Sequence, residues 1–326
     1  MTGPVPTDRV ALLVNGRSRR GADGYGRAVR DLRAAGLVVV RTVLLRDPAE
    51  LPAEVAAAVG LGCRLLVVGG GDGTVGAVAG LLADLPAETR PVLGVLPLGT
   101  ANDFARTLDL QPGVVPAIAA LTTGKVVDVD LGRANGAPFL NVASLGLSVG
   151  ATTALHPGLK RRLGPLAYPI AALQAYRRHV AFDVRLEFPD DDREPLELSD
   201  LLQVAIGNGR HYGGGNTVAP DAGIDDANLD VYAVRAGRLR EHLSLARLLR
   251  NGTLVHHDHV QHVVTPALVL TSDRPLPVNL DGEIAATSPV EFRVQRNAVE
   301  VVVPAHISHL SHEGVPVREA RTTEPR

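Results

Sequence analysis

The chain has 326 residues and a formal charge of −2, with 33 Lys and Arg against 35 Asp and Glu, one cysteine and 3% aromatic residues. A chain of this length exceeds a single hydrophobic core, so we expect two domains. The lone Cys63 excludes a disulfide scaffold and fits a reducing compartment, while the balanced charge and scarce aromatic rings exclude a protein devoted to nucleic acid.

The first 125 residues alternate short apolar runs with helical stretches. We predict strands at 9–14, 38–45, 64–68 and 91–96, and helices at 23–35, 49–59, 74–82 and from residue 102 onward. The apolar runs are nearly continuous, which is typical of parallel strands covered by helices on both faces. We therefore expect an α/β domain over residues 1–125, with 304–318 as a candidate segment to complete it.

After Lys125, short strands separated by turns predominate. They are predicted at 126–131, 139–145, 181–188, 196–205, 228–234, 262–270, 289–294 and 298–303, with helices near 165–178 and 239–251. This pattern predicts an antiparallel β-sandwich over residues 126–303. The polar end, 319–326, is expected to be disordered.

Residues 134–159 carry no Lys, Arg, Asp or Glu, a length that would suit a membrane span. The same stretch contains Asn, Ser, Thr, Pro and Gly, which are costly in a lipid-facing helix. The beginning of the chain lacks the pattern of a signal peptide. We therefore expect no membrane span and a cytoplasmic protein.

A glycine cluster, GGGDGT at 69–74, stands between a predicted strand and a predicted helix. Glycines let backbone N–H groups approach phosphate oxygens, and the helix N-terminus adds its positive end. Asp72 is unusual there, because a carboxylate beside phosphates is repulsive unless it binds Mg²⁺ or accepts a proton from the phosphoryl acceptor. The simpler alternative is a turn in which Asp72 caps the helix.

A second loop, PLGTANDFAR at 97–106, follows the fourth predicted strand. The carboxyl ends of parallel strands share one edge of the sheet, where open α/β sheets bind ligands. Asn102 and Asp103 would also serve as a helix cap. Two glycine-containing loops, each with an aspartate at a strand end, favour a phosphate-binding site.

Together these two motifs resemble the soluble lipid kinases built on the diacylglycerol kinase catalytic domain. That family includes bacterial diacylglycerol kinases and sphingosine kinases, with NAD kinases and 6-phosphofructokinases as distant relatives. Further motifs follow the same order along most of the chain: LLVN at 12–15, GNGR at 207–210, GGG at 213–215, APDA at 219–222 and NLDGE at 279–283. The resemblance implies an NAD kinase- or phosphofructokinase-like nucleotide-binding domain and a C-terminal sandwich that binds lipid and metal.

The resemblance implies phosphorylation of a lipid hydroxyl with ATP as co-substrate and Mg²⁺ as cofactor, diacylglycerol being the first candidate acceptor. Phosphoryl transfer needs positioned phosphates, Mg²⁺ and a carboxylate near the acceptor hydroxyl. Asp281 is the implied general base, Asp72 competes for that role, and Glu283 supports the base or holds Mg²⁺. If the segment is extended, Asp281 and Glu283 lie on one face; the alternative is a hairpin turn.

The implied nucleotide-binding residues are Asn15, Arg17, Gly70, Gly71, Asp72, Gly73, Thr74, Gly99, Thr100 and Asn102.

The resemblance also implies metal ligands at Asp226, Asp225 and Asp103. Carboxylates suit a hard cation such as Mg²⁺, and an acidic surface turn is the alternative for the first two. The chain departs from the family pattern at Ala227, where glycine is usual. If that position needs a positive φ, alanine costs about 1 kcal/mol. It also has Gly76-Ala77 where many bacterial members carry Asn-Glu.

Two other clusters have simpler explanations. Apolar residues between Lys160 and Arg178 are flanked by basic clusters, which suits either a helix at an acidic membrane surface or a helix packed on the sandwich. The histidines at 256, 257, 259 and 262 favour a surface or packing role over a metal site, because they lie between a helix and a strand.

The expected partners are ATP and a membrane lipid met by transient contact with the membrane surface, without nucleic acid, and a homodimer stays open. Two other functions also stay open. One is a kinase of a soluble acceptor, as in NAD kinases, and the other is a catalytically silent nucleotide or lipid sensor.

Overall fold

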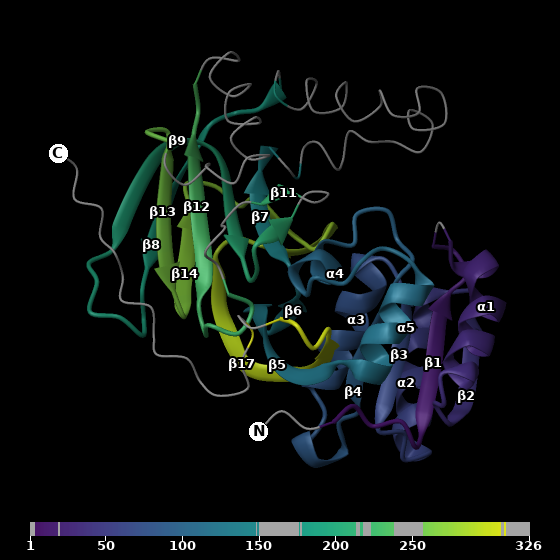
Figure 1. The fold of residues 1–326 in the computed structure, drawn as a ribbon. Helices are drawn as coiled ribbons and strands as arrows, with labels where there is room; N and C mark the ends of the chain where they lie inside the picture. Colours follow the sequence, from purple (N-terminus) through teal and green to yellow (C-terminus); the bar gives the residue numbers. More distant parts are fainter. Residues whose placement is uncertain are drawn as a thin grey trace.

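The computed structural model describes residues 4–18, 20–147, 149, 176, 178–212, 216–217, 223–237, 257–307 and 310. The predicted helices at 165–178 and 239–251 fall almost entirely outside these residues. The GGG and APDA motifs, His256 and the end of the chain from 311 also fall outside them. Figure 1 shows the described chain as an N-terminal unit of strands and helices beside a C-terminal unit of strands.

The N-terminal unit is a parallel sheet in the order β2-β1-β3-β4, as the alternating pattern predicts. Its strands are β1 (Val10–Asn15), β2 (Val39–Leu45), β3 (Leu65–Gly70) and β4 (Val92–Pro97). Its helices are α1 (Gly21–Ala34), α2 (Leu51–Gly60), α3 (Asp72–Ala83), α4 (Asp103–Thr107) and α5 (Val114–Thr123), with short 3₁₀ turns η1 (Pro48–Glu50) and η2 (Ala87–Thr89). The helix predicted from residue 102 is therefore only the short α4, and α5 was not predicted.

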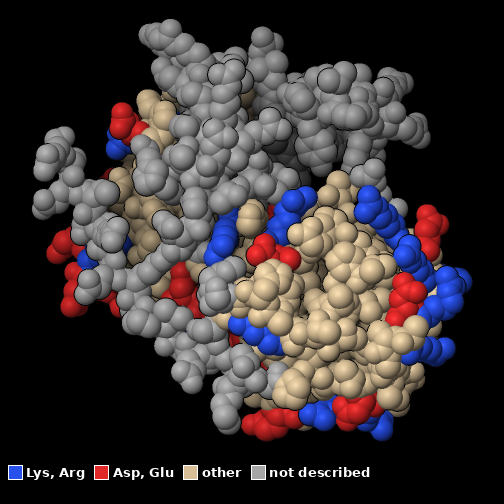
Figure 2. Space-filling view, viewed as in Figure 1, with Lys and Arg blue, Asp and Glu red and all other residues tan. Residues whose placement is uncertain are grey.

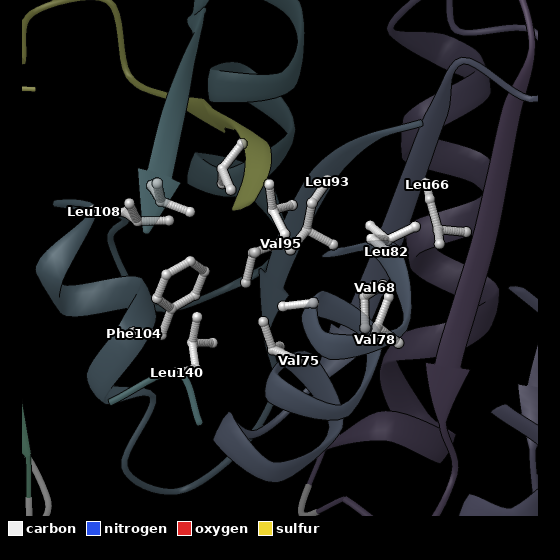
Figure 3. Packing of buried hydrophobic residues seen from close by; sticks show 14 of the residues in the cluster. Leu66, Val68, Val75, Val78, Leu82, Leu93, Val95, Phe104, Leu108 and Leu140 are labelled. Atoms are coloured by element: carbon white, nitrogen blue, oxygen red, sulfur yellow. The ribbon is translucent and has the colours of Figure 1, made fainter. Parts of the chain in front are cut away.

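Helices cover both faces of this sheet, and alternate residues of each strand enter different cores. In β1, Ala11 and Leu13 belong to the core under α2 and α3, while Leu12 and Val14 belong to the core under α1 and α5. This alternation explains the continuous apolar run, since each buried Leu or Val contributes about 2 kcal/mol on either face. Figure 3 shows the first of these cores, with the labelled residues Val75, Val78 and Leu82 of α3 against Leu66 and Val68 of β3 and Leu93 and Val95 of β4.

The C-terminal unit is built from antiparallel strands around a separate apolar core. The strands are β5 (Lys125–Ala134), β6 (Ala137–Phe139), β7 (Val142–Gly146), β8 (Phe182–Glu187), β9 (Leu196–Gly207), β10 (His211–Tyr212), β11 (Asn216–Thr217), β12 (Leu229–Arg235), β13 (Val260–Thr265), β14 (Ala267–Ser272), β15 (Pro277–Leu280), β16 (Glu283–Thr287) and β17 (Val290–Val303). Side chains from β7, β8, β9, β12, β14 and β17 fill one apolar core between the layers, and Phe139 meets Phe292 edge to face with ring centroids 6.3 Å apart. The predicted β-sandwich is confirmed.

Several predicted strand boundaries were wrong. The stretch 262–270 is two strands, and 289–294 with 298–303 is the single strand β17. The β15–β16 hairpin was not predicted as strands. In β17, a polar residue separates the two predicted strands. Asn297 has φ 49° and lies where the register of β17 with β5 shifts, between Gln295 and Val299.

Strand β17 joins the two units. Both halves of β17 pair with β5; the first half also pairs with β14, and the second half pairs in parallel with β4 at Val301 and Leu93. Apart from β10 and β11, which pair only with each other, the described strands of both units thus form one continuous hydrogen-bonded sheet.

Charges of both signs are interspersed over the surface in Figure 2, mostly along the rim of the N-terminal unit around an uncharged area. On this face the two signs are mixed, which agrees with the net charge of −2. Within the described residues, no helix is long and apolar enough to cross a membrane.

Candidate active site

The loops after β1 and β3 meet at the carboxyl edge of the parallel sheet. The strand order changes direction between these two neighbouring strands, which is where open α/β sheets bind ligands. Asn15, the last residue of β1, donates from Nδ2 to Oγ1 of Thr74 at 2.8 Å, and its Oδ1 accepts the backbone N–H of Arg17 at 2.9 Å. The side chain of Asn15 therefore fixes its own turn and ties it to the first turn of α3.

The two glycine-containing loops touch backbone to backbone. A Cβ placed on Gly99 would stand 2.4 Å from Cα of Gly71, so neither loop has room for a side chain there. Asn102 adopts the left-handed region with φ 53°, and its Oδ1 accepts the N–H of Gly99 at 2.9 Å. A Cβ on Gly73 would meet nothing within 4 Å, so that side of the loop is open for a ligand.

Asp72 links the two loops. Its Oδ1 accepts the backbone N–H of Phe104 at 3.0 Å, at the start of α4. Burial raises the pKa of Asp72 and the charge of the buried Asp103 raises it further, against the backbone hydrogen bonds from Phe104 and Asn102. Asp72 therefore does not cap the helix that follows it, contrary to the simpler alternative, because its Oδ1 binds the start of α4 in the other loop, beside a second carboxylate.

Asp281 reaches this edge from the C-terminal unit, at the tip of the β15–β16 hairpin. Asp281 and Gly282 are the two loop residues, with φ 49° and 107°, as a tight hairpin with two left-handed residues requires. The segment is therefore not extended, and the expectation that Asp281 and Glu283 share a face was wrong, because the turn separates them. Glu283 begins β16 with its side chain exposed, and its catalytic role stays a prediction.

Three consecutive backbone N–H groups bind the carboxylate of Asp281. Leu140 donates to Oδ2 at 2.5 Å, while Asn141 and Val142 donate to Oδ1 at 2.9 and 3.0 Å. Burial raises the pKa of Asp281 and the nearby charge of Asp72 adds to the rise, while the three N–H groups oppose it. A carboxylate offers about four lone-pair positions, so Oδ2 retains one for a further partner.

Leu140 belongs to the N-terminal core, where it appears near Phe104 in Figure 3. The segment that binds Asp281 is thus anchored in the unit that carries the glycine loops.

The acidic loop at 223–228 closes on itself. Asp226 accepts the N–H of Gly223 at 2.9 Å and of Asn228 at 3.0 Å, and Ala227 adopts φ 60°. The N–H of Ala227 donates to Oδ2 of Asp130 at 2.7 Å. Position 227 therefore does take a positive φ, which is the condition under which alanine is expected to cost about 1 kcal/mol.

The carboxylates of this site suit a cation that binds together with phosphates better than a cation held by protein ligands alone. Within the described residues, no three His, Cys, Asp or Glu side chains group as a metal-binding cluster. Asp72 and Asp103 offer carboxylates at the carboxyl edge of the parallel sheet, and Mg²⁺ commonly uses one or two carboxylates together with substrate phosphates and water. Roles for Asp225 and Asp226 as ligands stay predictions.

Other predicted residues lie at the periphery. Arg17 and Thr100 are exposed at the tips of their loops. His262, by contrast, contacts the buried Asp230 through Nε2 at 2.8 Å and stacks on Tyr232 with ring centroids 4.8 Å apart, so it is a packing residue, as expected for this cluster.

Sequence reasoning missed the contribution of residues 140–142 and the position of His211 beside α4. The first act through backbone N–H groups, for which side-chain identity carries no signal. His211, on β10, lies with Nδ1 3.2 Å from Oγ1 of Thr107 on α4. Burial and the charges of Arg210 and Arg106 lower the pKa of His211.

Comparisons with known proteins match both units of the chain. Residues 9–134 match the family model of the diacylglycerol kinase catalytic domain, and residues 141–303 match the YegS C-terminal NAD kinase beta sandwich-like domain. A protein of Chromohalobacter salexigens named "Probable lipid kinase YegS-like" is 35% identical over 93% of this chain and 95% of its own, and one of Yersinia pestis with the same name is 32% identical over 90% and 96%. A crystal structure described as a diacylglycerol kinase from Bacillus anthracis superposes with a TM-score of 0.73 at 26% identity, covering 90% of this chain and 96% of the other.

Proposed function

The chain belongs to the family of YegS-like lipid kinases, and on this premise we propose that it transfers the γ-phosphate of ATP to a hydroxyl group of a membrane lipid. Diacylglycerol is the first candidate acceptor, met through transient contact with the membrane surface. The observation that carries the proposal is the position of Asp281: a Cβ placed on Gly76, in the helix that begins at Asp72, would stand 3.4 Å from its Oδ2, although the two residues come from different units.

The nucleotide side of the proposed site is the edge formed by the loops after β1, β3 and β4. Gly71 and Gly99 let the two loops pack together, Gly73 borders open space, and α3 begins at the glycine cluster with its N-terminus toward that edge. Asn15 and Thr74 hold the first two loops together. This arrangement supports ATP binding with the phosphates over Gly70 to Thr74.

The acceptor side is the hairpin tip. Asp281, held by three N–H groups, has one lone-pair position on Oδ2 for the hydrogen of an acceptor hydroxyl. In the proposed step the hydroxyl proton moves to Asp281 as the oxygen attacks the γ-phosphorus, and the bond to ADP breaks. Asp72 and Asp103 would hold Mg²⁺, which when bound neutralises charge developing on the phosphates.

The experiment is phosphorylation of a total bacterial lipid extract by the purified protein with radiolabelled ATP, followed by identification of the labelled product. A labelled lipid that disappears in Asp281→Asn and persists in the exposed-residue control Glu187→Gln supports the proposal. Label found only in a water-soluble product, or tight ATP binding with no transfer to any lipid, contradicts it. The first result indicates a kinase of a soluble acceptor and the second a silent sensor.

A further inference from the structure

Asn208 follows β9 and is 1% exposed. Its Nδ2 donates to two backbone carbonyl oxygens, of Asp130 at 2.8 Å and of Leu140 at 3.1 Å. Its backbone N–H donates to a third, of Asn141, at 2.9 Å. Because both partners of the side chain are acceptors, the amide orientation is determined, with the nitrogen toward residues 130 and 140.

The peptide groups that Asn208 binds are the ones that bind Asp281. The peptide between Leu140 and Asn141 accepts from Asn208 at its oxygen and donates from its N–H to Asp281. The next peptide, between Asn141 and Val142, does the same with the backbone N–H of Asn208. Two hydrogen-bond chains thus run from Asn208 through one peptide group each to Oδ1 of Asp281.

Such chains act on both position and charge. The peptide group is planar, so a bond that fixes its C=O also fixes the direction of its N–H. Hydrogen bonds in series polarise one another, so a donor at the carbonyl strengthens the N–H bond to a carboxylate at the other end.

The other end of the Asn208 amide argues against a packing role. Its Oδ1 is buried and accepts no hydrogen bond from the described residues. An unpaired buried oxygen is costly, and an apolar side chain of the same shape would avoid that cost. The two bonds donated by Nδ2 are therefore the reason for asparagine at this position.

We propose that Asn208 is a positioning residue, which fixes the carboxylate of Asp281 through the two peptide groups of residues 140–142 without touching ATP or the acceptor. Its effect on turnover rests on the proposed kinase function. The effect of Asn208 on the N–H groups of Asn141 and Val142 does not rest on that function, so the effect on turnover and the effect on these N–H groups can be tested separately.

The test uses Asn208→Ala in the full chain, which removes the Nδ2 bonds and keeps the backbone bond to Asn141. The control is Ser272→Ala, which removes side-chain hydrogen bonds to Arg274 and Ser288 in the same unit. Native-state hydrogen exchange should show faster exchange at the amide of Asn141, by about tenfold, with a smaller change at Val142 and none in the control. Unchanged exchange at Asn141 overturns the proposal whatever the enzyme's activity.

The kinetic test is a double-mutant cycle with Asp281→Asn. Asn208→Ala should lower kcat about tenfold with KM for ATP unchanged, and should cost little further once Asp281 is replaced. An equal loss in both backgrounds would mean that Asn208 does not act through Asp281. Should Asn208→Ala fail to fold, Asn208→Ser, which keeps one hydroxyl donor, is expected to give the same pattern at a smaller amplitude, and its absence there also contradicts the proposal.

Discussion

Gly76 on α3 faces the carboxylate of Asp281: a Cβ placed on Gly76 would stand 3.4 Å from Oδ2 of Asp281 and 3.7 Å from Cβ of Leu140. The hairpin of the C-terminal unit therefore seats its carboxylate directly over the helix that begins at Asp72. The small residue at position 76 sets how closely the two approach.

Side chains of increasing size at position 76 should separate stability from activity. Gly76→Ala places its methyl group at ordinary contact distance and adds helix propensity, so stability should rise by up to about 1 kcal/mol with activity retained. Gly76→Val extends methyl groups toward Oδ2 and should lower kcat about 100-fold by displacing Asp281. Gly26→Ala on α1 is the control for helix propensity, and full activity in Gly76→Val would contradict the contact.

Replacing each candidate base should distinguish their roles. Asp281→Asn should lower kcat about 1000-fold, because the proton acceptor is lost. Asp72→Asn keeps an oxygen for the N–H of Phe104, so it should fold normally and lose both ATP affinity and part of kcat. Steady-state kinetics with varied ATP measures both effects. Normal turnover in Asp281→Asn would transfer the base role to Asp72.

The pH dependence of stability should depend partly on His211. Its pKa is lowered in the folded protein from 6.5, so the unfolded chain binds the proton first. The free energy of unfolding from this group is therefore fully present above pH 6.5 and is lost as the pH falls toward the folded pKa. Thermal melts at pH 5 and pH 8 should differ less in His211→Gln than in the wild type, and an equal difference in the two proteins would contradict this prediction.

Ala227→Gly should stabilise the protein. Alanine at φ 60° is strained, and glycine should recover about 1 kcal/mol of the free energy of unfolding. Chemical denaturation measures the gain. Asp200→Gly is the matched control at φ 57°, where aspartate tolerates the left-handed region and the gain should be smaller. A loss of stability in Ala227→Gly would contradict the prediction that alanine is strained at this position.

Gly99→Ala should act on nucleotide binding. Its Cβ would stand 2.4 Å from Cα of Gly71, so the two loops must separate. Overpacking of this kind should raise KM for ATP about tenfold. Isothermal titration with a non-hydrolysable ATP analogue checks the affinity directly, and unchanged binding would exclude these loops as the nucleotide site.

Strands β1, β3 and β4 could be predicted closely because they are apolar and buried on both faces. β1 and β3 contribute side chains to two cores, and the glycine cluster at 69–71 marks the end of β3 in the sequence. In the longer C-terminal strands, β9 and β17, the alternation of buried and exposed residues is interrupted. Asn297 reads as the end of a strand, although the backbone continues through it with a bulge.

The site was harder to predict where backbone atoms do the binding. Residues 140–142 contribute three N–H groups that almost any sequence would offer. The pairing of Asp281 and Glu283 failed because period-two alternation applies only to an extended chain, and two positive φ values interrupt it. The GNGR motif was visible, but the role of Asn208 depends on a segment far away in the sequence.

The continuity of β17 has a consequence for how the molecule comes apart. Removing β17 would leave β4, β14 and β5 each without the neighbouring strand with which they pair. Residues 1–134 alone would therefore expose the apolar side chains that β17 now covers. Heating should therefore melt the whole chain in a single transition, and limited proteolysis should not release a stable N-terminal fragment.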